Sequence, residues 1–144
     1  WQIIQGLETV GLRMKQHCAN AEKVVTFLET QKKVTNVIYP TNHQGEIKER
    51  AKKYMQGGYG SLVGMDVGTK EAGAKFIDNL KMLYHVANIG DARSLAIHPA
   101  TTTHSQLDDA ALAAAGVTPG YVRLSIGIEH PDDIISDIKQ ALAA

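Results

Sequence analysis

The chain has 144 residues, and its 15 basic side chains balance 15 acidic ones, so the formal net charge at pH 7 is zero. This length suits one domain, spanning residues 1–144, with a core of its own. The charges are scattered and form no basic footprint for nucleic acid or an anionic membrane surface. The apolar runs are too short to span a bilayer, and the single cysteine, Cys18, excludes an internal disulfide. We therefore predict a cytoplasmic domain without nucleic-acid or membrane partners.

Residues 1–30 have the spacing of a long amphipathic helix. Apolar or small side chains recur at alternating intervals of three and four residues, which places them on one helical face. We expect this helix to lie on its own domain; a coiled coil is the alternative, but the small residues would make its seam thin. The start has no signal-peptide pattern, and we expect the helix to continue from an upstream segment. The positions of the apolar face are Ile4, Leu7, Gly11, Met14, Cys18, Ala21, Val25 and Leu28.

Short strands and helices alternate through the middle of the chain. β-Branched residues before Pro40 predict a strand over 34–39, and the glycine-bounded run 61–67 predicts another. Thr69 offers an N-cap for a helix through about residue 83. The remaining expected elements are a charged helix over 46–55 and two short strands, 86–89 and 94–97, around the turn Gly90-Asp91.

The last third contains the clearest strand. Ser105 with Asp108 resembles a capping box for a short alanine-rich helix that ends at Gly116. Residues 121–129 then alternate between an apolar face (Val122, Leu124, Ile126, Ile128) and a polar face (Tyr121, Arg123, Ser125, Gly127, Glu129). Pro131 opens a final helix. The pattern predicts an α+β fold, a small mostly antiparallel sheet covered by helices on one face.

Arg123 is the first candidate for a functional residue. It interrupts an apolar strand and shares its face with Ser125 and Gly127. A guanidinium group presents a planar fork of donors that matches a carboxylate in two parallel hydrogen bonds. The alternative is an ordinary surface arginine on a half-exposed sheet.

Other candidate sites are weaker. The six histidines show no pair at the spacing of metal ligands, and we predict no metal site. Cys18 lacks an activating neighbour and suits a small core residue. The run Thr101-Thr102-Thr103 could bind a ligand, although such runs more often satisfy their own loop backbone.

Three stretches together resemble the Cys/Met-metabolism enzymes that use pyridoxal phosphate. These stretches are residues 5–14, the loop SLAIHPATTTH at 94–104, and GVTP at 116–119 leading into VRLSIGIEH at 122–130. The resemblance runs from end to end of the chain. Within the family, the threonine loop looks closest to the O-acetylhomoserine sulfhydrylases, which are transferases of methionine biosynthesis. Before Ser94 the chain has Asp91-Ala92-Arg93, where many lyase relatives have glycines and a glutamate.

The resemblance implies the C-terminal, substrate-facing domain of a fold-type-I enzyme. The lysine that forms the Schiff base with pyridoxal phosphate would belong to a larger N-terminal domain, so no catalytic residue and no covalent cofactor are expected in this chain. Arg123 matches the arginine that binds the substrate α-carboxylate, and Ser94 matches a position beside that carboxylate. Thr101, Thr102, Thr103 and His104 would shape the same active-site mouth.

The implied partners are that N-terminal domain, O-acetylhomoserine, sulfide and further copies of the enzyme, commonly as a tetramer. The implied reaction is replacement of the γ-acetate by sulfide or a thiol to give homocysteine or a related product. Cystathionine γ-synthase, cystathionine γ-lyase and methionine γ-lyase activities are alternatives, as is a non-catalytic interaction module.

Overall fold

A computed structural model describes all residues from Trp1 to Ala144. The five strands form one sheet in the order β1-β2-β5-β4-β3, antiparallel except for the parallel pair of β3 and β4. The predicted α+β class with a mostly antiparallel sheet is therefore confirmed. The strands are β1 (Asn36–Ile38), β2 (Leu62–Asp66), β3 (Tyr84–His85), β4 (Leu95–Ile97) and β5 (Tyr121–Ser125).

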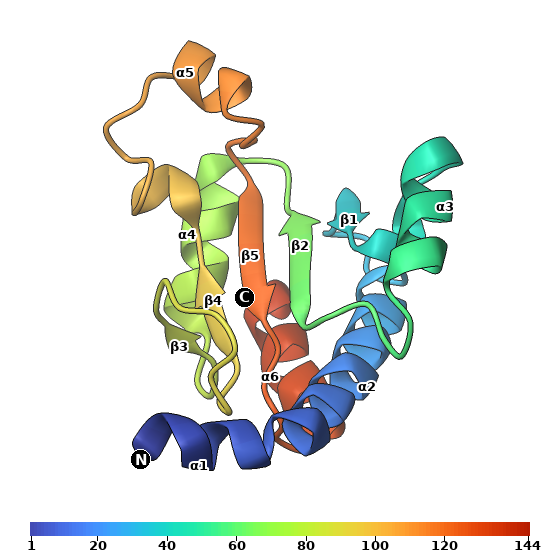
Figure 1. Ribbon diagram of the computed structural model, residues 1–144. Helices are drawn as coiled ribbons and strands as arrows, with labels where there is room; N and C mark the ends of the chain where they lie inside the picture. The colour runs from blue at the N-terminus through green and yellow to red at the C-terminus, as the bar shows by residue number, and fades with distance from the viewer.

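Helices cover one face of this sheet and leave the other face open. Figure 1 shows α2, α4 and α6 behind the strands, while α1, α3 and α5 lie at the periphery. The core forms where the apolar sides of β2 and β5 meet α2 and α6. None of the helices has the length and hydropathy needed to cross a membrane. The helices are α1 (Gln2–Glu8), α2 (Val10–Leu28), α3 (Gly45–Tyr54), α4 (Lys70–Asn79), α5 (Asp109–Ala114) and α6 (Pro131–Ala143), with 3-10 turns η1 (Pro40–Asn42) and η2 (Pro99–Thr101).

The expected single N-terminal helix is two helices. The chain leaves helical geometry at Thr9, where φ is −107° and ψ is 1°. Arg13 stabilises this break, because its side chain donates hydrogen bonds to the Gly6 carbonyl (2.6 Å) and to Thr9 Oγ1 (3.2 Å). The expected apolar face is buried only in the second half of α2, whereas Ile4 is 62% and Leu7 63% exposed. The apolar spacing continues across Thr9, so the sequence pattern does not indicate the break.

Two predicted boundaries in the middle of the chain are wrong. Helix α4 begins at the expected N-cap, since Thr69 Oγ1 accepts the Ala72 N–H, but it ends at Asn79 instead of residue 83. The backbone N–H groups of residues 81–83 bind the Asp137 carboxylate of α6, a partner that lies 54–56 residues away. The strand expected at 86–89 does not form, and Tyr84–His85 pairs with β4 instead.

The C-terminal third needs two further corrections. Asp108, not Ser105, caps α5, because its carboxylate accepts the Ala111 N–H at 2.8 Å. Gly116 follows this helix with φ +72°, a conformation that favours glycine. Strand β5 ends at Ser125 instead of residue 129. Beyond it the backbone bonds to Ser61 and Ala92 instead of to a neighbouring strand.

Candidate functional site: an arginine in the middle of the open sheet face

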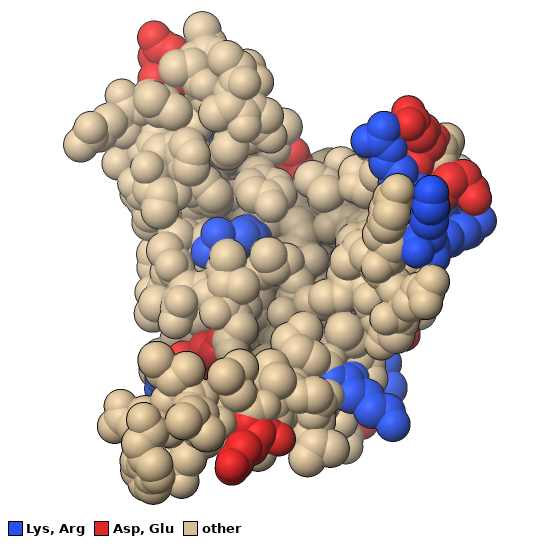
Figure 2. All heavy atoms as spheres, in the orientation of Figure 1, with Lys and Arg blue, Asp and Glu red and all other residues tan.

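Arg123 lies at the centre of the open face. It is in the middle of the central strand β5, between Gly64 of β2 and Ile97 of β4. Val122 and Leu124 point into the core and are 0% exposed, so the intervening Arg123 points away from the helices. It is the only lysine or arginine in the five strands. Figure 2 looks onto this face, which is mostly uncharged apart from a basic group in its middle, while charged side chains gather over α3.

A small pocket lies beside Arg123. Its volume is about 210 Å³, and its wall is mostly apolar. Gly64 is one of the residues that line it. A larger residue would not fit at this position, because a Cβ there would come within 2.7 Å of the Tyr121 ring. Burial raises the pKa of the Tyr121 phenol, against the opposing effect of Arg123, so this hydroxyl is neutral. The lining residues are Ile38, Tyr39, Pro40, His43, Leu62, Val63, Gly64, Tyr121 and Arg123.

The guanidinium of Arg123 has few partners within the chain. Its Nη2 donates one long hydrogen bond, 3.4 Å, to the Asn88 carbonyl oxygen, and its Nε is buried without any partner. All four ion pairs of the structure involve other residues. A half-buried cation without a carboxylate is costly to desolvate. This arrangement suits a group that receives its carboxylate from a ligand.

Ser94 is fully buried, and its donors are already occupied. Its backbone N–H donates to Glu129 Oε1 at 2.6 Å, and its hydroxyl donates to Glu129 Oε2 at 2.9 Å. The same hydroxyl accepts the N–H of Gly127 at 2.8 Å. The expected contact of Ser94 with a substrate carboxylate stays a prediction.

The threonine loop is bonded within itself. Thr101 Oγ1 lies 2.9 Å from the buried ring of His98, and Thr102 Oγ1 donates to the His98 carbonyl at 2.8 Å. Thr103 Oγ1 pairs with His104 Nδ1 at 2.8 Å. These four side chains have no hydrogen bond to Arg123, and their role at an active-site mouth also stays a prediction.

The histidines and acids do not assemble a metal site. No group of three His, Cys, Asp or Glu side chains is close enough to hold an ion. His98 is a core residue whose Nε2 lies 2.8 Å from the Pro119 carbonyl oxygen.

Two residues at the site were not singled out from the sequence. Asn88 contacts Arg123 through its backbone carbonyl oxygen. The sequence could not indicate this contact, because any residue type offers a carbonyl and because residues 86–89 were predicted to be a strand. Glu129 binds Ser94. Its signal was present, since Glu129 belongs to the polar alternation of the segment that carries Arg123.

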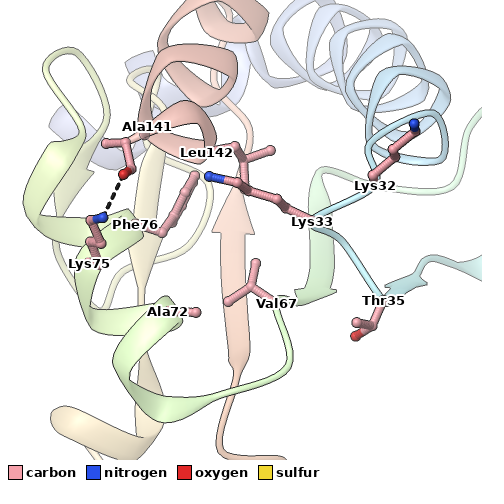
Figure 3. Close-up of a pocket in the computed structure, with 10 residues that line it drawn as sticks. Lys32, Lys33, Thr35, Val67, Ala72, Lys75, Phe76, Ala141 and Leu142 are labelled. Carbon is pink, nitrogen blue, oxygen red and sulfur yellow. Dashed lines mark hydrogen bonds between the residues drawn. The ribbon is translucent and has the colours of Figure 1, made fainter.

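The largest pocket lies on the helical side of the sheet, and its lining does not fit pyridoxal phosphate, which we expect in a separate N-terminal domain. It measures about 380 Å³, and Figure 3 shows Lys33 and Lys75 on either side of Phe76, with Lys32 pointing away. Its lining contains no aspartate or glutamate side chain to pair with a pyridine nitrogen. Lys75 instead donates to the Ala144 carbonyl oxygen at 2.5 Å. Lysines elsewhere are exposed or half-buried, unlike the desolvated amine of a Schiff-base lysine.

Comparison with known proteins places the chain in one family. Residues 1–143 match the family model of the Cys/Met metabolism PLP-dependent enzymes. The chain is 50% identical to the O-acetyl-L-homoserine sulfhydrylase of Leptospira meyeri over 99% of its own length and 33% of that protein. It is 41% identical to the L-methionine gamma-lyase of Fusobacterium nucleatum over 99% of its length and 36% of that protein.

A solved structure agrees with this assignment. A crystal structure described as an O-acetylhomoserine (thiol)-lyase from Campylobacter jejuni, with a pyridoxyl-lysine monophosphate, matches with a TM-score of 0.92. Its sequence identity is 40%, and the match covers 100% of this chain and 34% of that one. The chain thus spans about a third of the length of the relatives that it matches. It belongs to the Cys/Met metabolism family of pyridoxal-phosphate-dependent enzymes.

Proposed function

We propose that this chain is the C-terminal, substrate-facing domain of an O-acetylhomoserine sulfhydrylase. In the longer enzyme, an N-terminal domain holds pyridoxal phosphate, and sulfide or a thiol replaces the acetate of O-acetylhomoserine to give homocysteine or a related product. The similarity to a sulfhydrylase of Leptospira meyeri, together with the open face around Arg123, supports this proposal. The enzyme would be cytoplasmic and assemble from several copies, commonly four.

The observation that carries the proposal is the unpaired guanidinium of Arg123. Its Nε is buried without a partner, and its one hydrogen bond to protein, to the Asn88 carbonyl, is long. A substrate α-carboxylate would supply the paired acceptors that this fork lacks. Binding the carboxylate in this way fixes the orientation of the substrate before any bond changes. Ser94 and the loop from Thr101 to His104 complete the proposed mouth of the site.

Substitution of Arg123 in the longer enzyme tests this role. Arg123→Ala should raise the KM for O-acetylhomoserine by about 10- to 100-fold, because hydrogen bonds to charged groups contribute about 1.5–3 kcal/mol. Arg123→Lys should recover part of the loss, since an ammonium group keeps the charge but not the fork. An unchanged KM for O-acetylhomoserine in Arg123→Ala would refute the assignment.

The second candidate is a lyase of the same family, such as a methionine γ-lyase or a cystathionine γ-lyase, or a cystathionine γ-synthase. The 41% identity to the methionine gamma-lyase of Fusobacterium nucleatum supports it. All of these substrates carry an α-carboxylate, so Arg123 has the same role in each. Product analysis separates them. Homocysteine from O-acetylhomoserine and sulfide identifies the sulfhydrylase, whereas release of a thiol from methionine identifies the lyase.

A further inference from the structure

The segment between β3 and β4, residues 86–94, covers part of the open sheet face beside Arg123. We name it the covering segment. Leu95 and Ile97 of β4 face the same side as Arg123, because they stand opposite Ser125 and Arg123 in the antiparallel register. They are nevertheless only 2% and 4% exposed, although the helices pack on the other face. Figure 1 shows this segment beside β4.

A series of contacts fastens the covering segment along β5 and its continuation. Starting from Arg123, the Asn88 carbonyl accepts from its Nη2, and the Gly90 N–H donates to Ser125 Oγ at 3.2 Å. The Ile128 N–H then donates to the Ala92 carbonyl at 2.9 Å. The covering segment therefore runs beside residues 123–129, from Arg123 to Glu129. The position of the Asn88 carbonyl against the guanidinium depends on this docking.

At the end of the covering segment farthest from Arg123, Glu129 binds Ser94 through two hydrogen bonds. Both of its carboxylate oxygens accept hydrogen bonds from Ser94, one from the backbone N–H and one from the hydroxyl. Ser94 is 0% exposed, so loss of the carboxylate would leave buried donors without a partner. The approach is close, because a Cβ on Gly127 would overlap the Glu129 carboxylate and the Ala92 carbonyl oxygen.

The backbone of Glu129 is itself held by α2. Asn20 Nδ2 donates to the carbonyl oxygens of Gly127 (3.0 Å) and Glu129 (2.8 Å). His17 Nδ1 lies 2.6 Å from the Ile126 carbonyl oxygen. Because α2 belongs to the core, Glu129 connects a rigid part of the domain to the covering segment.

We propose that Glu129 is a positioning residue for carboxylate binding by Arg123. Its carboxylate binds Ser94 and so fastens the covering segment, and the covering segment places the Asn88 carbonyl beside the guanidinium. Without Glu129 the segment detaches from β5, and Arg123 samples orientations in which its donors miss the substrate. This inference rests on the proposed function of Arg123.

The test uses Glu129→Ala in the longer enzyme. The kcat/KM for O-acetylhomoserine should fall by about 10-fold or more, because small displacements of a binding group are costly. Glu129→Gln keeps an acceptor for the Ser94 N–H and should recover most of the loss. If Glu129→Ala does not fold, Glu129→Asp, one methylene too short to reach both Ser94 donors, should lower kcat/KM in the same direction.

Asp137→Asn is the matched control for a loss of stability. Asp137 is also a buried carboxylate that binds backbone N–H groups, but it lies on the helical side and contacts residues 81–83. It should lower the midpoint of thermal unfolding without changing the KM for O-acetylhomoserine. An effect of Glu129→Ala that appears only in thermal stability, as for Asp137→Asn, would overturn the inference.

Combining Glu129→Ala with Arg123→Ala separates this inference from the proposed function. If Glu129 acts through Arg123, its substitution should change kcat/KM by less than about twofold when Arg123 is already absent. Fully multiplicative effects overturn the positioning role and leave the function of Arg123 intact. An unchanged KM in Arg123→Ala alone overturns both.

Discussion

Asp137 shows how one side chain can set the end of an element distant in sequence. It is 6% exposed, and its carboxylate accepts the backbone N–H groups of Lys81, Met82 and Leu83 at 2.8–3.0 Å. Burial alone would raise the pKa of this carboxyl. The hydrogen bonds from the backbone and from Gln140 outweigh burial and hold the pKa below its usual range. The ionised carboxylate is therefore the form that stabilises the fold.

Asp137→Asn should destabilise the chain by about 2 kcal/mol at pH 7, because three backbone donors lose a charged acceptor. The pH dependence follows from the lowered pKa. The stabilisation is complete above the ordinary aspartate pKa of about 4. It disappears as the pH falls through the lower pKa that this carboxyl has in the folded chain. Urea unfolding should be measured at pH 7 and at successively lower pH. The difference in the free energy of unfolding between the original chain and Asp137→Asn should shrink below about pH 4. A difference that stays constant down to pH 2 would contradict this account.

At the scale of elements, α4 is packed closely against η2, the turn that follows β4. Gly73 faces His98, and a Cβ at this position would lie 2.5 Å from Nε2 and 2.7 Å from Cδ2 of the ring. The ring cannot move away, since its two nitrogens are bonded to Thr101 and to the Pro119 carbonyl. Glycine is required here for contact between helix and turn, not for backbone conformation.

Gly73→Ala should therefore lower the free energy of unfolding by about 1–3 kcal/mol, as overpacking of a core does. Gly11→Ala is the matched control, because Gly11 is also helical but has nothing within 4 Å of its Cβ position. That change should raise stability by about 0.5–1 kcal/mol through helix propensity. Denaturant unfolding of both variants measures the two effects. Equal effects of the same sign would show that packing against His98 is unimportant.

The elements that the sequence predicted best are those with local causes. Thr69 caps α4 as expected, and the alternation of Val122 and Leu124 correctly assigned the two faces of β5. The errors have causes that lie far away in the chain. Helix α4 ends early because of Asp137, and the run 86–89 is not a strand because it covers β4 instead of joining it.

The candidate site divides in the same way. The position of Arg123 on the face of β5 opposite the core followed from a period of two, and the complete burial of Val122 and Leu124 confirms it. The pairing of Ser94 with Glu129 joins residues 35 apart across a loop, and no local pattern reports such a contact. The role of Arg123 and Ser94 in binding a substrate stays a prediction.

At the scale of the whole molecule, apolar surface gathers at the N-terminal end. Ile3 is 79%, Leu7 63% and Leu12 75% exposed, and α1 has no buried residue. Figure 1 shows α1 projecting along the edge of the domain with little packed against it. An exposed apolar helix of this kind favours association with another surface.

The chain alone should therefore self-associate weakly. Sedimentation velocity over a range of concentrations should show the average mass rising with concentration. Replacing Ile3 and Leu7 with glutamate should suppress this rise, whereas Ile47→Glu, at an exposed position of α3, should not. A monomer at every concentration would contradict the prediction.

The order of the strands has a consequence for how the domain assembles. β5 is the last strand in the chain, yet it lies between β2 and β4 and supplies the hydrogen bonds that join the two halves of the sheet. During synthesis the first four strands can form only separate pairs until residues 121–125 emerge, so closure of the sheet is a late, long-range event. In pulsed hydrogen exchange, the amides of β2 that face β5 should gain protection together with β5 itself. Arg123 and the strand that unites the sheet thus reach their final positions in a single step of folding.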